Sequence, residues 1–300
     1  MGITSEEIVS KLREMGLAAG DTLLIHASIK SMGYVEGGPR AVARALLEAV
    51  GPAGTLVAPA FTFAHEIQEN PLFDMEREPS EMGSVTEAVR TLPGALRSAA
   101  YRHSVSAVGP NAVRICGTPV EKSPFSMEGS FGQMLNLDAK VLLMGVSYVH
   151  CTAAHFAEYL SNVPYRHSMM KPMRILRKDG TAEQVTAEDY QPKPTADGSY
   201  YHAPDDFDKA GAMLEALGKV TVLPVGNAIF RLFSMRDFVE LVGSHFMAGR
   251  NILYFEKGQT ERTLLRDGTL ITTYYLDKAG REDESVRSVV KAEDVFGRRK

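Results

Sequence analysis

The sequence predicts an α/β fold in which helices and strands alternate and pack in layers. The first two observations are the apolar strand patterns at residues 22–27 and 55–59, each of which follows a helical pattern within the first sixty residues. This αβαβ order is typical of layered α/β proteins. The third observation is the uninterrupted apolar run at residues 141–144, VLLM, which Gly145 ends. A run of that length with a glycine stop indicates a strand buried on both faces.

The other expected elements of the N-terminal half follow from caps, breakers and periodicity. A capping box at residues 4–7 opens the first helix, and Gly51-Pro52 stops the second. The expected elements are, in order, helix 4–16, strand 22–27, a glycine-bearing loop 28–38, helix 40–50, strand 55–59, a long loop 64–81, helix 84–92, strand 103–108, strand 141–144 and a helix carrying residues 152–158.

The C-terminal half begins with a hairpin signal, because Asp179-Gly180 lies between two short apolar segments. A second Asp-Gly pair lies near residue 267. The expected elements are, in order, strands 173–176 and 182–185, a loop 190–204, helix 206–217, strand 220–224, helix 234–242, strands 264–266 and 269–275, and a charged tail 281–300 that is either a peripheral helix or partly mobile.

Length and composition restrict the class of protein. A chain of 300 residues with 44% hydrophobic and 23% charged residues suits a soluble globular protein, either one large domain or two lobes. We expect one domain, with a core over 1–163 and a C-terminal half over 164–300. The net charge of −4 gives no reason to expect nucleic acid, and no long apolar segment predicts a membrane span or a signal peptide. The two cysteines, with no framework or metal set, fit the cytoplasm.

The strongest candidate for catalysis follows the apolar run at residues 141–144. Thr152, His155 and Glu158 are spaced by three residues, so they share one helix face. Ligands in open α/β sheets bind beyond the carboxyl ends of strands, and a carboxylate beside a histidine can orient it as a general base. The alternative is an ordinary i,i+3 ion pair. Cys151, four residues before His155, is either a nucleophile or a small core residue.

Three segments suit an elongated, phosphate-bearing ligand. Residues 28–38, SIKSMGYVEGG, join a strand to a helix and combine hydroxyls with glycines, which favours a pyrophosphate. The segment has neither the GxxxxGK[ST] nor the GxGxxG pattern, and a plain β–α turn is the alternative. Residues 97–109 contain two arginines and a His-Ser pair, and residues 129–132, GSFG, form a small-residue turn.

Five blocks in order, HASIKSMGYVEGG, GPAGTLVAPAFTF, MGSVTEAVR, RHSVSAVG and VLLMGV…TAAHFAE, resemble the aminoglycoside 3-N-acetyltransferase (antibiotic N-acetyltransferase) family. The resemblance implies a layered α/β/α sandwich unrelated to the GNAT acetyltransferases, with β-hairpins added in the C-terminal half. It also implies acetyl-CoA as co-substrate and His155 and Glu158 as the catalytic pair. The residues it places along CoA are Ser28, Ile29, Ser31, Gly33, Val35, Arg97, His103, Ser104, Val105, Ser130 and Phe131.

Two departures from the family pattern concern the acceptor. Ala100-Tyr101 stands where the family usually has His-Pro, and loop 147–150, SYVH, lacks the common acidic residue. The expected function is an acetyl-CoA-dependent N-acetyltransferase acting on an amine of an aminoglycoside or related natural product by direct transfer. The alternatives are a biosynthetic N-acyltransferase with another donor or amine, and a non-catalytic CoA-binding relative. We expect no metal and a monomer or homodimer.

The acidic residues of segment 64–81 bear on the acceptor. They crowd one segment of a chain that is only mildly acidic as a whole, and together with Asp205 and Asp206 they predict a cationic acceptor. The alternative is a solvated surface loop. The acidic residues of the segment are Glu66, Glu69, Asp74, Glu76, Glu78 and Glu81.

Overall fold

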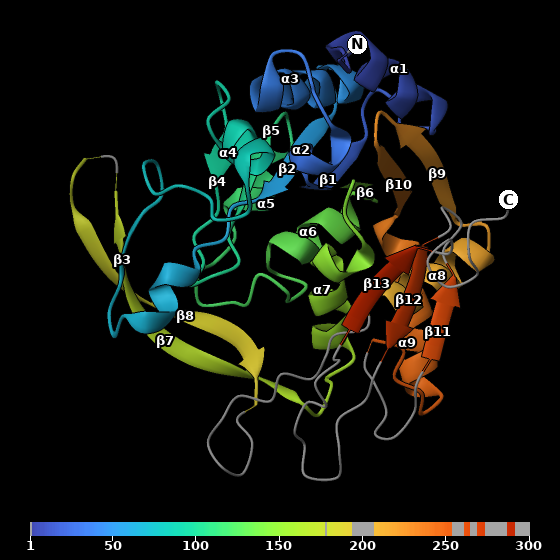
Figure 1. Cartoon of the computed structure of the whole chain (residues 1–300). Coiled ribbons are helices and arrows are strands. Elements are labelled where there is room, and N and C mark those ends of the chain that lie inside the picture. The colour runs from blue at the N-terminus through green and yellow to red at the C-terminus, as the bar shows by residue number, and fades with distance from the viewer. Residues whose placement is uncertain are drawn as a thin grey trace, which may run out of the picture.

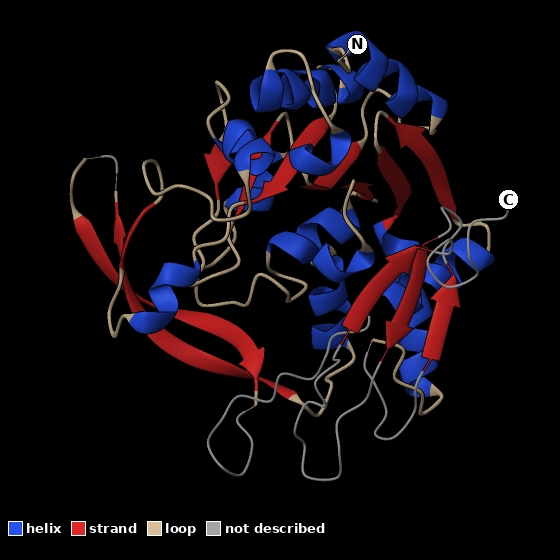
Figure 2. Ribbon diagram, in the orientation of Figure 1, coloured by secondary structure: helices blue, strands red, loops and turns tan. Residues whose placement is uncertain are grey.

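A mixed β-sheet runs through the centre of the molecule and carries helices on both faces (Figures 1 and 2). The computed structural model describes residues 2–177, 179–193 and 207–253, and the backbone of three further strands within 261–291. No helix within these ranges combines the length and the apolar character needed to cross a lipid bilayer. The α/β fold class predicted from the sequence is confirmed.

The central sheet has three parallel strands in its middle and antiparallel strands outside them. β1 pairs in parallel with β2 and β6, whereas β5 and β10 pair antiparallel to β2 and β6. The strands in spatial order are β4 (Leu96–Arg97), β5 (Val105–Val108), β2 (Thr55–Pro59), β1 (Thr22–Ala27), β6 (Lys140–Met144), β10 (Ala228–Ser234) and β9 (Val220–Val225).

Both faces of the central strands are buried, which explains the continuous apolar run in β6. Val141 and Leu143 join the core on one face, whereas Leu142 and Met144 join the core on the other. Because side chains alternate along a strand, a strand covered on both sides needs apolar residues at every position.

The helices are divided between these two cores. The hydrophobic residues of α1, α3 and α4 belong to one core, and those of α5 to α9 belong to the other. The Thr4 hydroxyl accepts a hydrogen bond from the Glu7 N–H at 3.2 Å, which confirms the predicted cap. The helices are α1 (Ser5–Glu14), α2 (Ile29–Met32), α3 (Gly38–Val50), α4 (Ser84–Arg90), α5 (Ala112–Cys116), α6 (Ser130–Asn136), α7 (Ala153–Leu160), α8 (Phe207–Ala216) and α9 (Met235–Met247), with 3-10 turns η1 (Phe63–Ile67) and η2 (Tyr148–His150).

Two smaller sheets flank the centre (Figure 1). In the first, β3 (Leu72–Asp74) pairs with the long hairpin of β7 (Arg166–Leu176) and β8 (Ala182–Pro192), over a small core of its own. The second contains β11 (Glu261–Leu264), β12 (Thr269–Thr273) and β13 (Arg287–Lys291).

Several predicted elements need correction. Strands 22–27 and 55–59 have the predicted bounds, but segment 64–81 contains η1 and β3 and is not one loop. The tail 281–300, expected as a helix or mobile segment, contains the strand β13. Residues 190–192 of the expected loop belong to β8, and its remainder from 194 lies outside the described residues.

The prediction missed β10 entirely. The division at residue 163 remains a prediction, although β9 and β10 extend the central sheet from beyond it.

Candidate active site

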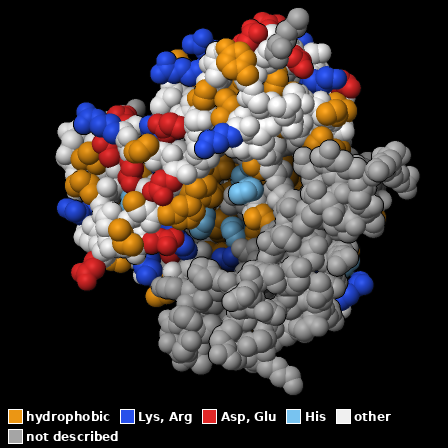
Figure 3. Space-filling model, viewed as in Figure 1, with side chains coloured by type: hydrophobic (Ala, Val, Ile, Leu, Met, Phe, Trp, Pro, Cys, Tyr) orange, Lys and Arg blue, Asp and Glu red, His pale blue; other side chains and the backbone are white. Residues whose placement is uncertain are grey.

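A cavity of about 750 Å³ opens where β1, β2 and β6 end. The residues that follow these strands, Ser28, Phe61 and Val146, line it, and the start of α7 closes another side. Figure 3 shows histidine side chains gathered with hydrophobic ones in a hollow on this face. The described lining residues are His26, Ala27, Ser28, Ile29, Lys30, Pro59, Phe61, Phe63, Met82, Gly83, Ser84, Val85, Thr86, Arg102, His103, Val146, Val149, His150, Cys151, Thr152, His155, Arg166, Pro192 and Phe207.

His155 faces this cavity from α7 and is held by a buried carboxylate. Its Nδ1 lies 2.7 Å from Oε2 of Glu158, and the same oxygen pairs with Arg166 Nε at 2.7 Å. The other carboxylate oxygen, Oε1, accepts the Tyr165 hydroxyl at 2.9 Å. Burial opposes ionisation of Glu158, but the Arg166 charge and these hydrogen bonds outweigh it and hold its pKa below the ordinary value. An ionised Glu158 accepts a hydrogen bond from the protonated Nδ1 of His155, which leaves Nε2 as the basic nitrogen.

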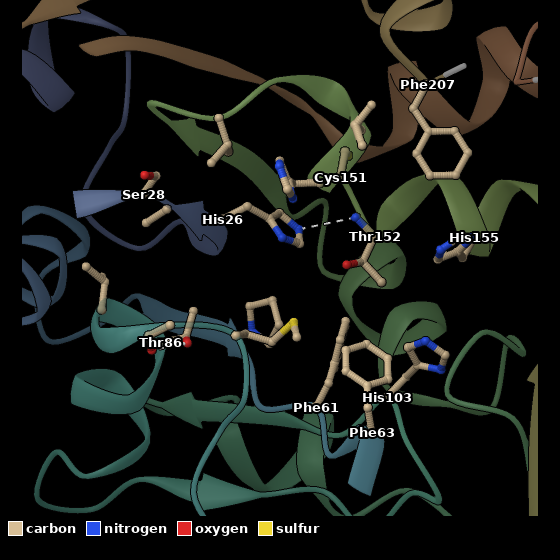
Figure 4. Close-up of a pocket in the computed structure, with 18 of the residues that line it drawn as sticks. His26, Ser28, Phe61, Phe63, Thr86, His103, Cys151, Thr152, His155 and Phe207 are labelled. Atoms are coloured by element: carbon tan, nitrogen blue, oxygen red, sulfur yellow. Dashed lines mark hydrogen bonds between the residues drawn. The ribbon is translucent and has the colours of Figure 1, made fainter. Parts of the chain in front are cut away.

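Thr152 begins α7 and connects it to β1. Its backbone N–H donates to Nε2 of His26 at 3.4 Å (Figure 4). Burial, helped by the charge of His150, lowers the pKa of His26 to about 3, so His26 is neutral and can accept this bond. The predicted trio of Thr152, His155 and Glu158 is therefore brought together, with the Thr152 and His155 side chains on one side of the cavity (Figure 4).

His103 lies at the same end of the cavity as His155, among aromatic rings. The two imidazole centroids are 6.1 Å apart, and Phe61 and Phe125 each lie 4.9 Å from the His103 ring. Burial, together with the Arg102, His155 and Arg166 charges, lowers the pKa of His103 well below its ordinary value. His103 is therefore a neutral member of the cavity wall at physiological pH.

The predicted pyrophosphate segment lies at the opposite end of the cavity. Ser28 and Ile29 line it, and the Ser31 hydroxyl donates to the Ser28 hydroxyl at 2.9 Å. Gly33 has a φ of 86°, and a Cβ there would lie 2.8 Å from the Asn227 side chain, so only glycine fits this turn. Val35 is buried in the hydrophobic core together with Ile3, and its backbone forms a β-bridge to that residue.

Five other residues expected along CoA lie in the protein interior in this structure. The Ser104 hydroxyl donates to Ala60 O at 2.6 Å, and Arg97 Nε donates to the Ser104 oxygen at 3.2 Å. Arg97 lines a separate cavity, and burial lowers its pKa to about 10. Their contact with CoA stays a prediction. The buried residues of this group are Arg97, Ser104, Val105, Ser130 and Phe131.

Carboxylates of the acidic segment are largely paired within the protein. Glu66 binds Arg102 at 2.6 Å, Glu78 binds His65 at 3.0 Å, and Glu81 accepts the Ala64 N–H at 3.1 Å. None of the segment's acidic residues lines the described part of the cavity. Asp205 and Asp206 lie outside the described residues.

Cys151 is an unfavourable nucleophile. Its side chain is completely buried, and burial raises the pKa of its thiol to about 12. The reactive form of cysteine is the thiolate, which is scarce at neutral pH when the pKa is so high. The small-core-residue interpretation fits this geometry better.

Sequence reasoning missed several residues of this cavity and of the network around Glu158. His26 was visible only as a polar residue within an apolar strand, and its role depends on Thr152, 126 positions away. Arg166 and Tyr165, which complete the Glu158 network, follow α7 but had no motif to mark them. The aromatic residues Phe63 and Phe207 also gave no signal, because such residues are most often core.

Comparison with known proteins supports one family. A family model described as aminoglycoside 3-N-acetyltransferase matches residues 24–247. Aminoglycoside N(3)-acetyltransferase IV from a Salmonella species is 32% identical over 235 residues, which cover 78% of this chain and 83% of that relative.

Solved structures of aminoglycoside acetyltransferases have a similar fold. AAC-VIa with sisomicin bound has a TM-score of 0.72 at 26% identity, covering 84% of this chain and 100% of that one. AAC-IIIb with CoASH has a TM-score of 0.74 over 84% of this chain and 98% of that chain; at 22% identity it shows the fold alone. These findings confirm the resemblance and the expected enzyme class, and the chain belongs to the aminoglycoside 3-N-acetyltransferase family.

Proposed function

We propose that the protein is an acetyl-CoA-dependent N-acetyltransferase in which His155 is the general base. The acceptor is an amine of an aminoglycoside or a related amino-bearing molecule. The observation that carries the proposal is the 2.7 Å contact between His155 and the buried Glu158 at the edge of a large cavity beyond the strand ends. The family description and the relatives named as aminoglycoside N(3)-acetyltransferases support an acetyl donor.

The proposed reaction is a direct transfer. The neutral amine attacks the thioester carbonyl carbon, and Nε2 of His155 removes the ammonium proton as the C–N bond forms. The carbon–sulfur bond then breaks, and the imidazolium returns the proton to the CoA thiolate. Glu158 stabilises the imidazolium while it exists, because its charge lies 2.7 Å from Nδ1. Thr152, beside His155 on the cavity wall, positions the acceptor (Figure 4).

CoA extends along the cavity from Ser28 to His155. Its pyrophosphate lies at the Ser28–Ser31 turn, and its thioester reaches the histidine end. Between these points the cavity is lined by His26, Val146 and Thr152, which suit the narrow arm of CoA with its polar and apolar groups. No metal enters this proposal.

The test is the His155→Asn variant assayed for thiol release with acetyl-CoA and a library of amines. We expect turnover to fall by about 100-fold or more, the usual scale for a lost general base. CoA affinity, measured by calorimetry, should change little. Cys151→Ala is the matched control, since its side chain lies one turn earlier on the same wall, and it should keep turnover. Near-normal turnover in His155→Asn would refute the base assignment.

One observation favours a second candidate, an N-acyltransferase for amines other than aminoglycosides. Among the cavity residues that the structure describes, none is Asp or Glu, whereas Lys30, Arg102 and Arg166 are cationic. An aminoglycoside is a polycation, so carboxylates are the side chains that would bind it best.

A further inference from the structure

His103 is a buried imidazole that lines the cavity and has no hydrogen-bond partner. Only 9% of the residue is exposed. Within the part of the chain that the structure describes, no hydrogen bond reaches either of its ring nitrogens, whereas His26 and His155 of the same cavity are both hydrogen-bonded. Leaving a buried polar group without a partner is costly, so such a group on a cavity wall indicates a ligand atom that binds it.

The backbone on both sides of His103 is fixed to the segment that follows β2. The Thr62 N–H donates to the backbone oxygen of Arg102 at 3.0 Å, and the Ala60 N–H donates to that of Ser104 at 2.8 Å. Because both chain neighbours are tied to the same segment, the position of His103 does not depend on a hydrogen bond from its own side chain.

Three phenylalanine rings hold the His103 imidazole in place. Phe61 lies 4.9 Å from it with the ring planes at 81°, and Phe63 lies 6.3 Å from it with the planes at 87°. Phe125 packs against it at 4.9 Å. A polar ring fixed by packing keeps its orientation when a ligand enters, which is the preorganisation that electrostatic catalysis needs.

The His103 and His155 rings are close enough to bind one small group between them. Their centroids are 6.1 Å apart, and they come from the segment before β5 and from α7 (Figure 4). A hydrogen bond joins heavy atoms about 3 Å apart, so a group between the rings lies within reach of a nitrogen of each. In the proposed reaction Nε2 of His155 serves the amine, which leaves the carbonyl oxygen for His103.

The charge state of His103 suits a hydrogen-bond donor. Burial lowers its pKa well below the ordinary value, so the ring is neutral at physiological pH. A neutral imidazole has one N–H, which it donates without giving up the proton, and can polarise a carbonyl in this way. His103 therefore does not compete with His155 for the proton of the amine.

We propose that His103 donates its N–H to the thioester carbonyl oxygen of acetyl-CoA and stabilises the oxyanion that forms there. The proposal rests on the N-acetyltransferase function proposed above, to whose reaction it adds a catalytic residue. When the amine nitrogen bonds to the carbonyl carbon, the π electron pair of the C=O bond moves to the oxygen. His103 keeps its proton and stabilises that negative charge through the hydrogen bond. The pair then re-forms the C=O bond as the carbon–sulfur bond breaks and the thiolate leaves.

The first test compares kcat of variants at saturating acetyl-CoA. His103→Phe keeps a ring against Phe61 and Phe125 but has no N–H, so kcat should fall about 100- to 1,000-fold, the usual scale for one lost oxyanion donor. His103→Gln has an amide N–H and should be at least about tenfold faster than His103→Phe. CoA lacks the acetyl carbonyl and should bind all three proteins alike in calorimetry. Cys151→Ala, which changes the cavity wall but removes no hydrogen-bond donor to the carbonyl, is the control and should keep kcat.

The second test measures the carbonyl itself and needs no acceptor. Infrared difference spectra of bound acetyl-CoA, with and without an isotope label at the carbonyl carbon, give the C=O stretching frequency, which falls when the oxygen accepts a hydrogen bond. In the wild type the band should lie below that of a simple thioester in an apolar solvent. In His103→Phe most of this shift should be lost. If His103→Phe does not fold, the wild-type band decides alone.

Three results would each overturn the proposal: an unshifted band in the wild type, a shift that persists in a folded His103→Phe protein, or turnover of that protein within about threefold of the wild type. Failure of the proposed function looks different. If no amine supports thiol release in the wild type, the N-acetyltransferase function falls, while the carbonyl band still shows whether His103 binds the thioester.

Discussion

Acidification should destabilise the protein through His26, the buried histidine near the end of β1. Burial and the nearby His150 charge lower its pKa to about 3, against 6.5 for an unperturbed histidine. Between these values the unfolded chain binds a proton that the folded protein does not. The free energy of unfolding therefore falls as the pH falls from 6.5 towards 3, and the loss stops below that.

The size of the effect follows from this window. One proton bound only by the unfolded state changes the free energy of unfolding by about 1.4 kcal/mol per pH unit. Between pH 7 and pH 5 the wild type should lose about 2 kcal/mol through His26 alone. His26→Gln has no titrating group there but can still accept the Thr152 N–H, so it should lack this part of the loss.

The assay is urea unfolding of both proteins at pH 7, 6 and 5. Other histidines and carboxylates titrate in both proteins, so the difference between the two curves isolates His26. The stability advantage of the wild type should shrink by about 2 kcal/mol from pH 7 to pH 5. Parallel pH dependence in the two proteins would refute the reasoning, because it would mean that His26 titrates alike in the folded and unfolded states.

Three further predictions concern the site and its frame. Glu158→Gln should lower the free energy of unfolding by about 3–5 kcal/mol, because it removes the carboxylate of a buried ion pair with Arg166; a loss below about 1 kcal/mol in urea unfolding would contradict this. Gly145→Ala should cost about 2 kcal/mol or more, since φ is 66° and the new Cβ would lie 2.8 Å from the Ser31 Cβ; an unchanged melting temperature would count against it. Ser31→Glu should weaken CoA binding by placing a negative charge against the pyrophosphate, whereas Ser31→Ala should have a much smaller effect; equal CoA affinity of Ser31→Glu and wild type in calorimetry would argue against the placement.

Strands of the central sheet were predictable where both of their faces are buried in a hydrophobic core. β1 and β6 are covered on both faces, so continuous apolar residues marked them. β10 was missed although it lies in the same sheet. Its sequence carries Arg231 in the middle, which is buried against Glu215 at 3.0 Å. A charged residue argues against a buried strand unless its partner is known, and that partner lies on α8, 16 residues earlier.

The candidate site was predictable to the extent that it is local. Thr152, His155 and Glu158 are neighbours on one helix, so their spacing alone indicated a shared face. Arg102 was predicted only as part of a basic segment. Its partner Asp189 is 87 residues away and Glu66 is 36 residues away, so no local pattern could reveal that the three meet. Charge pairing between residues so far apart in the sequence depends on the packing of the hairpin against the sheet.

The antiparallel pairing of β6 with β10 has a consequence for how the chain reaches its folded state. β6 precedes α7, yet the strand that covers its outer edge is made about ninety residues later. A nascent chain that ends at residue 163 would present β6 as an open edge, with unpaired backbone groups and apolar side chains on both faces. The site at the end of β6 therefore cannot be completed until synthesis has passed residue 234, and a fragment holding every proposed catalytic residue should associate with itself rather than fold alone.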